Sequence, residues 1–132
     1  MRSSSLRRIL YVDDDKDACL LMGLLIQQYN EDYGVIAVGT VQKALDLMSD
    51  LSFDLYILDY RMPEMSGIEL CRLIRQTDSD TPIMIYSSLA READREDALN
   101  AGATAYLVKP NDFDNFNETI EELMSKKYRS DH

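Results

Sequence analysis

The chain has 132 residues, of which 45% are hydrophobic and 29% are charged, as is typical of one globular domain. Acidic residues outnumber basic ones by 24 to 14, and the formal net charge is −10. This charge argues against direct binding to nucleic acid or to an anionic membrane surface. His132 is the only histidine, which argues against Ser-His or Cys-His catalysis and against a His-ligated metal.

The sequence also predicts where the protein works. No apolar run approaches the roughly 18–20 residues needed to span a bilayer, and residues 1–8 lack the apolar stretch of a signal peptide. Cys19 and Cys71 lie in apolar helical patterns outside any metal-type cluster, so we expect two reduced core thiols. We therefore expect a cytoplasmic protein.

Short apolar runs alternate with longer amphipathic segments from the start of the chain. Residues 9–12 are a candidate buried strand, ended by the aspartates at 13–15. A helix is expected from residue 16 to about residue 29, because apolar side chains recur there at helical spacing. These side chains are Ala18, Leu21, Met22, Leu25 and Tyr29.

The middle of the chain repeats this alternation. Residues 35–38 form a second expected strand, and Thr40 is the expected N-cap of a helix that extends through Met48. Residues 55–58 form a third strand, ended by Asp59. The spacing of Ser66 and Glu69, within Ser66-Gly67-Ile68-Glu69, is that of a capping box, which predicts the start of another helix.

Two further strand and helix pairs complete the pattern. Residues 83–86 form a fourth strand, and the helix expected over residues 91–101 has few large apolar groups and ends at Gly102. Residues 105–108 form a fifth strand, closed by Lys109 and Pro110. Asp112 is expected to open a last helix, whose inner face holds Phe113, Phe116, Ile120, Leu123 and Met124.

Five consecutive strand and helix units predict an α/β fold with a parallel sheet covered on both faces. Right-handed crossovers then favour an open, doubly wound sheet. We expect residues 1–132 to form a single domain with a core over about residues 8–126 and to hold no output domain.

Ligands of such sheets bind outside the carboxyl ends of the strands. Asp13 and Asp14, Asp59, Ser87 and Lys109 follow strands one, three, four and five. Clustered carboxylates repel one another unless a cation neutralises them, and their oxygens suit Mg²⁺. An aspartate beside Mg²⁺ and a lysine can attack a phosphoryl group and become an aspartyl phosphate, to which a serine hydroxyl can donate.

Four segments, YVDDD, LDYRMPEMSG, PIMIYSS and YLVKP, resemble the signature segments of the response-regulator receiver family in order and spacing. The resemblance extends over nearly the whole chain. It implies a flavodoxin-like (βα)5 three-layer sandwich with a five-stranded parallel sheet of order 2-1-3-4-5. It also implies that Asp59 accepts a phosphoryl group from a sensor histidine kinase or a histidine phosphotransfer protein.

The resemblance further implies a role for each site residue. Asp14, Asp59 and the backbone carbonyl of Arg61 should bind Mg²⁺ directly, and Asp13 should act largely through bound water. Lys109 should pair with the phosphoryl group. Such a protein is no enzyme in the ordinary sense, because it catalyses only its own phosphoryl transfer and slow self-dephosphorylation.

Other residues fit the family pattern less closely. The switch hydroxyl is usually a threonine and is Ser87 here, and Ser88 replaces a small alanine. Tyr106 matches the switch aromatic, and phosphorylation should draw Ser87 away and leave space that Tyr106 can enter. The Lys109–Pro110 peptide should be cis. Asp15 has no matching metal role and is expected to open the first helix.

Two other functions remain open at this point. A haloacid-dehalogenase-like phosphatase also uses an aspartate nucleophile, and residues 13–15 contain its D-x-D pattern. A degenerate receiver would serve only as an interaction module. For a working receiver, we expect a face within residues 91–127 to bind a downstream protein or a second copy of the chain.

Overall fold

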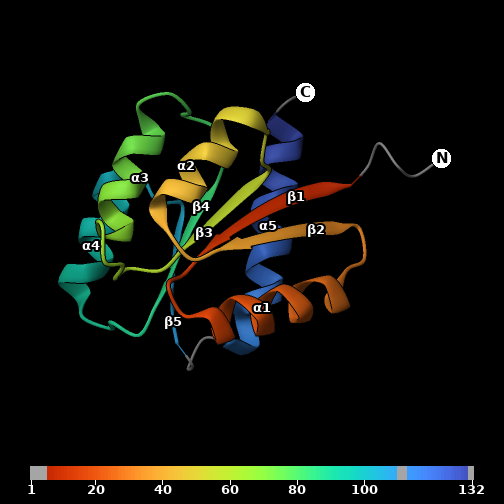
Figure 1. Cartoon of the computed structure of the whole chain (residues 1–132), viewed down its shortest axis with the longest axis horizontal. Helices are drawn as coiled ribbons and strands as arrows, with labels where there is room; N and C mark the ends of the chain where they lie inside the picture. Colours follow the sequence, from red (N-terminus) through yellow and green to blue (C-terminus); the bar gives the residue numbers. More distant parts are fainter. Residues whose placement is uncertain (1–5, 110–112, 131–132) are drawn as a thin grey trace.

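A parallel five-stranded sheet forms the centre of the computed structural model, which describes residues 6–109 and 113–130. The strands lie in the order β2-β1-β3-β4-β5, as predicted, with helices on both faces (Figure 1). The strands are β1 (Arg7–Val12), β2 (Tyr33–Val38), β3 (Leu55–Leu58), β4 (Ile83–Ser87) and β5 (Ala105–Val108). The helices are α1 (Lys16–Tyr29), α2 (Val41–Asp50), α3 (Gly67–Arg75), α4 (Glu92–Ala101), the short 3₁₀ turn η2 (Phe113–Asn115) and α5 (Phe116–Ser130).

The sheet separates two hydrophobic cores, because successive side chains of a strand point to opposite faces. On β1, Leu10 belongs to one core and Tyr11 to the other. The first core is closed by buried residues of α2, α3 and α4, and the second by buried residues of α1 and α5. The expected inner face of the last helix is confirmed for four residues, Phe116, Ile120, Leu123 and Met124.

Local hydrogen bonds explain where several helices begin and end. The Asp15 carboxylate accepts from the backbone amides of Asp17 and Ala18, so this residue opens α1 as predicted. Ser66 forms the expected capping box with Glu69 at the start of α3. At the end of α4, Gly102 takes the left-handed conformation with a φ of 111°.

The expected buried face of α1 is partly wrong. Met22 and Ile26 are buried, whereas Leu21 is 55% exposed. Leu20 and Leu24 are exposed to 67% and 60%. Because α1 is apolar on several sides, spacing alone does not decide which side meets the sheet. The helix therefore leaves a leucine surface, made of Leu20, Leu21 and Leu24, in contact with solvent.

The remaining sequence predictions have mixed outcomes. Cys71 is a buried thiol as expected, but Cys19 is only half-buried, with its thiol 3.1 Å from the backbone oxygen of Asp13. Pro110, with the predicted cis peptide, and Asp112 lie outside the described residues. Over residues 6–109 and 113–130, we find no helix with the length and hydropathy of a bilayer span.

Gly67 has the least room for a side chain of the five glycines. Its amide donates a 2.7 Å hydrogen bond to the Tyr60 carbonyl, which closes the loop between β3 and α3. A Cβ atom at residue 67 would lie 2.0 Å from the backbone oxygen of Asp59. Only glycine lets α3 begin this close to the end of β3, so Gly67 fixes the loop that follows Asp59.

We predict that Gly67→Ala destabilises the protein by about 1–3 kcal/mol, because the added methyl group forces backbone atoms apart. Gly23→Ala is the matched control, since a Cβ atom there meets its nearest neighbour at 3.9 Å. That change should stabilise α1 by about 1 kcal/mol. Urea unfolding of both variants measures the two effects, and equal midpoints would contradict this account of Gly67.

Candidate functional site

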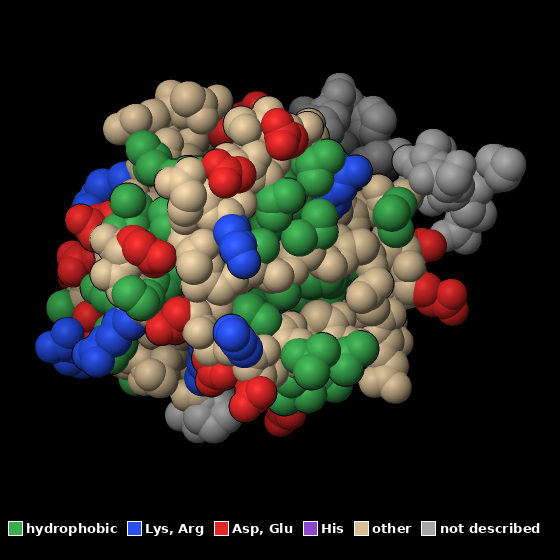
Figure 2. Space-filling model, in the orientation of Figure 1, with side chains coloured by type: hydrophobic (Ala, Val, Ile, Leu, Met, Phe, Trp, Pro, Cys, Tyr) green, Lys and Arg blue, Asp and Glu red, His purple; other side chains and the backbone are tan. Residues whose placement is uncertain are grey.

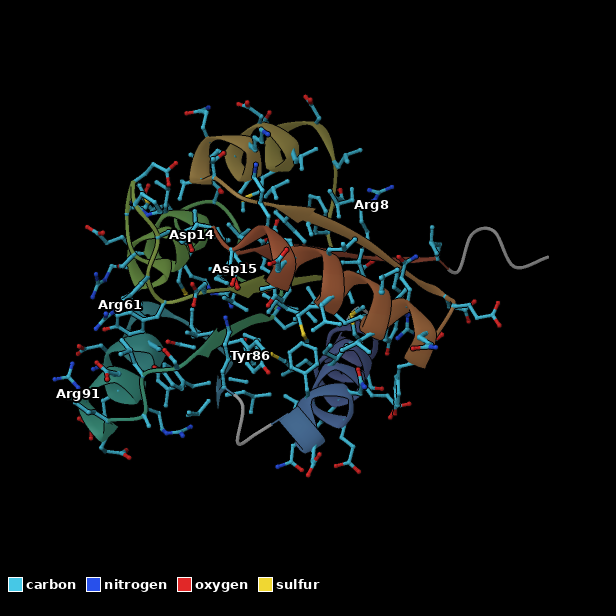
Figure 3. The ribbon with its side chains drawn as sticks, turned by 60° about the horizontal axis from the view of Figure 1, so that its bottom comes forward. Arg8, Asp14, Asp15, Arg61, Tyr86 and Arg91 are labelled. Carbon is cyan, nitrogen blue, oxygen red and sulfur yellow. The ribbon has the colours of Figure 1, made fainter. Side chains whose placement is uncertain are left out.

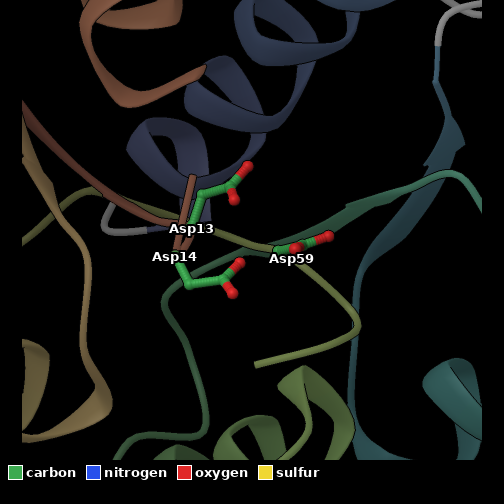
Figure 4. A group of neighbouring side chains, drawn as sticks. All are labelled: Asp13, Asp14 and Asp59. Atoms are coloured by element: carbon green, nitrogen blue, oxygen red, sulfur yellow. The ribbon is translucent and has the colours of Figure 1, made fainter. Parts of the chain in front are cut away.

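Three carboxylates meet at the carboxyl edge of the sheet, where β1 and β3 end (Figure 4). One oxygen atom from each of Asp13, Asp14 and Asp59 lies within 4.8 Å of the others. Asp13 is buried, Asp59 is half-buried and Asp14 is exposed. The site is therefore open to solvent on the Asp14 side and closed beneath Asp13.

Backbone hydrogen bonds hold these carboxylates in place. The amide of Asp13 donates to the Val38 carbonyl at 3.1 Å, and the amide of Asp59 donates to the Val12 carbonyl at 3.0 Å. The parallel ladder thus continues one residue past the ends of β1 and β3. The Tyr60 amide donates to Asp59 Oδ1 at 3.0 Å and orients that side chain.

Lys109, at the end of β5, reaches across the sheet edge to the carboxylates. Its Nζ lies 3.0 Å from Asp13 Oδ2 and 3.7 Å from Asp59 Oδ1. It also lies 5.3 Å from the centre of the Tyr86 ring, a cation–π distance. Burial lowers the pKa of Lys109, but the Asp13 hydrogen bond and the Asp59 charge outweigh it and raise the pKa overall. The lysine is therefore a stable cation.

Asp59 has the most perturbed carboxylate of this group. Burial raises its pKa to about 6, and the charges of Asp13 and Asp14 add to this effect. Lys109 and the Tyr60 amide oppose it by favouring the ionised form. At neutral pH Asp59 remains mostly ionised, so it is available as a nucleophile.

Ser87 and Tyr106, the expected switch pair, lie close to this site on β4 and β5. Ser87 is buried, and its Oγ accepts from the Leu89 amide at 3.1 Å. The Tyr106 hydroxyl donates to the Leu89 carbonyl at 2.7 Å, and the residue is only 4% exposed. The aromatic ring therefore already lies inward, with the Tyr106 side chain also hydrogen-bonded to Ser87.

Arg61 lies in the loop after β3, and Figure 3 shows it at the same end of the molecule as Asp14. Its backbone carbonyl as a metal ligand stays a prediction. Sequence reasoning missed the site roles of Gly67 and Tyr86. The position of Tyr86, one residue before the switch serine, was a usable signal, whereas the contact of Gly67 with Asp59 appears only in three dimensions.

The carboxylate cluster suits a divalent cation by its chemistry. All three donors are hard oxygen atoms, and three carboxylates against one lysine leave an excess of negative charge. Mg²⁺ prefers such oxygen ligands and keeps several waters, which the exposed side at Asp14 admits. Asp15 does not belong to the cluster, because its carboxylate caps α1.

A sheet of order 2-1-3-4-5 with an acidic cluster and a lysine at its carboxyl edge defines a flavodoxin-like α/β domain with its candidate site at the ends of the strands. The family profile described as the response regulator receiver domain matches residues 9–121. The chain belongs to this family of two-component signalling domains. Receiver domains of this family bind Mg²⁺ at an acidic pocket and act with histidine kinases.

Two relatives from Escherichia coli K12 illustrate the sequence similarity. Transcriptional regulatory protein ZraR is 32% identical over 93% of this chain, which corresponds to 27% of ZraR. Transcriptional regulatory protein CpxR is 38% identical over 80% of this chain and 44% of CpxR. The chain thus spans less than half of these relatives. That the chain binds no nucleic acid stays a prediction.

Solved structures extend the likeness. A CheY-like receiver domain protein from Methanospirillum hungatei is 29% identical, with a TM-score of 0.85 over 96% of this chain and 99% of that one. Response regulator TrrA from Thermotoga maritima is 30% identical, with a TM-score of 0.78 over 89% and 98% of the chains. The TrrA structure is a complex with Mg²⁺ and BeF.

We predict that Mg²⁺ raises the melting temperature, because a ligand of the folded state stabilises that state. At ten times the dissociation constant the gain is about 1.4 kcal/mol, or roughly 5 °C. Asp14→Asn should remove most of it. Asp15→Asn is the control, since asparagine also caps helices and the position lies outside the cluster. Equal Mg²⁺ responses of the two variants in thermal denaturation would contradict the assignment.

Proposed function

We propose that this chain is a working receiver that accepts a phosphoryl group on Asp59 and transmits the change to a protein-binding face. The observation that carries the proposal is the position of Asp59. Its carboxylate lies at the open end of β3, in the same cluster as Asp13 and Asp14 and 3.7 Å from Lys109. We place the reaction in the cytoplasm and assign residues 8–126 to the receiver.

In the proposed reaction, a carboxylate oxygen of Asp59 attacks the phosphorus of a phosphohistidine on the donor protein. The new O–P bond forms as the P–N bond breaks, and the electron pair stays on the imidazole nitrogen, which takes up a proton. Asp14, Asp59 and the Arg61 carbonyl would hold Mg²⁺ directly and Asp13 would hold it through water, and the bound ion would supply neutralisation of the charge on the phosphoryl oxygens.

Lys109 and Ser87 stabilise the product in this scheme. The ammonium group of Lys109 is shared between Asp13 and Asp59, so only a small movement brings it to a phosphoryl oxygen. Ser87 Oγ accepts from the Leu89 amide and is hydrogen-bonded to the Tyr106 side chain, so its hydroxyl reaches a phosphoryl oxygen by exchanging Tyr106 for the new acceptor. The side chains thus provide a cation and a hydroxyl donor next to the acceptor.

We predict that acetyl phosphate with Mg²⁺ adds one phosphoryl group to the protein and that Asp59→Asn abolishes the addition. A chelator should also stop the reaction, because the carboxylates then repel the incoming anion. Intact-mass spectrometry measures the product. Equal labelling of Asp59→Asn would place the nucleophile elsewhere and favour the phosphatase alternative.

The donor has a suitable docking place beside the acceptor. A groove of about 560 Å³ extends from Asp14 along α1 to Val35 on β2. Its rim includes Leu20 and Leu24 of the leucine surface, and Figure 2 shows hydrophobic side chains gathered over this part of the molecule. Because Asp14 belongs both to the groove and to the acidic cluster, a protein bound here reaches Asp59 directly. We propose that the phosphohistidine donor binds this surface.

We predict that Leu20→Ser and Leu24→Ser slow phosphoryl transfer from a donor protein at least tenfold but leave labelling by acetyl phosphate unchanged. The probe is the phosphorylated histidine phosphotransfer domain, chosen from a panel, that labels the wild type fastest. Leu99→Ser is the matched control, because Leu99 is 48% exposed but lies on α4. A loss with Leu99→Ser that equals the loss with Leu24→Ser would contradict the proposed docking place.

The output face is proposed to lie on the other side of the acceptor, over α4, β5 and α5 within residues 91–127. Helix α4 contributes only Asp94, Ala98 and Ala101 as buried residues, so little apolar contact holds it. Weakly held elements move at low cost in a two-state switch. A downstream protein is the proposed partner of this face, and a homodimer is the alternative.

A further inference from the structure

Arg95 of α4 contacts the switch aromatic at two points. Its Nη1 donates a 3.1 Å hydrogen bond to the backbone oxygen of Tyr106. The centre of its guanidinium lies 5.2 Å from the centre of the Tyr106 ring, within the range of a cation–π interaction. Arg95 is half-buried, and it is the one basic residue among the acidic side chains of α4.

These two contacts differ in how they depend on the ring. The hydrogen bond goes to a backbone oxygen, so it persists whichever rotamer Tyr106 adopts. It therefore fixes a cation in front of the inward ring position. The cation–π contact exists only when the ring is inward, as does the hydrogen bond from the Tyr106 hydroxyl to the Leu89 carbonyl. Arg95 thus stabilises the inward position of the Tyr106 ring relative to an outward position.

The ends of α4 are held so that Arg95 keeps this position. At the first turn, the buried Asp94 carboxylate accepts from Arg91 Nε and Nη2 at 3.0 Å and is also hydrogen-bonded to Tyr60 in the loop after β3. Beyond the last turn, Arg75 Nε donates to the Gly102 carbonyl at 2.9 Å. The helix therefore presents Arg95 to β5 from a backbone tied at both ends.

We propose that Arg95 is a positioning residue that holds Tyr106 inward and thereby presets the receiver toward its phosphoryl-bound conformation. This inference rests on the proposed function together with the expectation that movement of Ser87 toward a phosphoryl group favours the inward Tyr106 ring. By linkage, whatever favours the inward ring also favours binding of a phosphoryl analogue at Asp59. Arg95 would then set how far this receiver is switched before any phosphoryl group arrives.

The test uses fluorine NMR of the full chain labelled with 3-fluorotyrosine. The chain has eight tyrosines, and the Tyr106 resonance is the one that disappears in Tyr106→Phe. Arg95→Met removes the charge and the donors but keeps a long side chain over the ring. Arg72→Met is the matched control, because Arg72 is an exposed residue of α3. Arg95→Lys keeps a cation without the planar guanidinium and should give an intermediate result.

In the absence of any phosphoryl analogue, Arg95→Met should move the Tyr106 resonance toward that of a solvent-exposed tyrosine. The affinity for beryllofluoride with Mg²⁺ should fall about threefold to tenfold. Arg72→Met should change neither quantity. An unmoved Tyr106 resonance, or a beryllofluoride affinity equal to that of Arg72→Met, would overturn the proposal.

The two proposals fail in different ways. If the wild type does not bind beryllofluoride at all, the proposed phosphoacceptor function is wrong, whereas the Tyr106 resonance still reports on Arg95. If the wild type binds beryllofluoride and Arg95→Met leaves the ring inward, only the positioning role is wrong.

Discussion

Repulsion among three carboxylates at one edge of the sheet is the constraint on which the site depends. Asp13, Asp14 and Asp59 are brought within 4.8 Å by the parallel pairing of β1 with β3, so the fold itself creates the unfavourable charge. Lys109 relieves part of it from β5, two strands away from β3. The remaining negative charge suits the site to a divalent cation, and in the proposed function an incoming phosphoryl group depends on that cation.

The three carboxylates also differ in exposure, and this difference gives them separate tasks. Asp13 is buried under Lys109 and orients the ammonium group through a 3.0 Å contact. Asp14 faces solvent and the groove along α1, which is where we propose that a cation with its waters and a donor protein bind. Asp59 lies between these extremes, accessible enough to react and enclosed enough for its pKa to rise to about 6.

Sequence reasoning predicted much of this arrangement, for identifiable physical reasons. The continuous apolar runs of the strands and the capping residues Asp15 and Ser66 fixed the element order, and the ends of the strands placed Asp13, Asp59 and Lys109 together. It could not decide which side of α1 is buried, because leucines occupy several sides of that helix. It also missed the Arg95 contact, since a helix of mixed charge gives no sign of which side chain faces a strand.

The hold of Arg75 on the end of α4 has a mechanical consequence. Its guanidinium donates to three backbone carbonyls, those of Gly102, Asp78 and Thr81, which ties the last turn of α4 to the loop after α3. The first turn of α4 is held through one side chain, the Asp94 carboxylate, which pairs with Arg91 and is hydrogen-bonded to Tyr60. The helix is therefore a lever about 15 Å long with its pivot at Gly102, and a tilt of about 10° displaces its first turn by about 2.6 Å. The largest movement falls at the first turn, which is the end nearest Ser87, and the pivot stays still. A partner bound to the first turn would therefore meet a larger displacement on switching than a partner bound to the last turn.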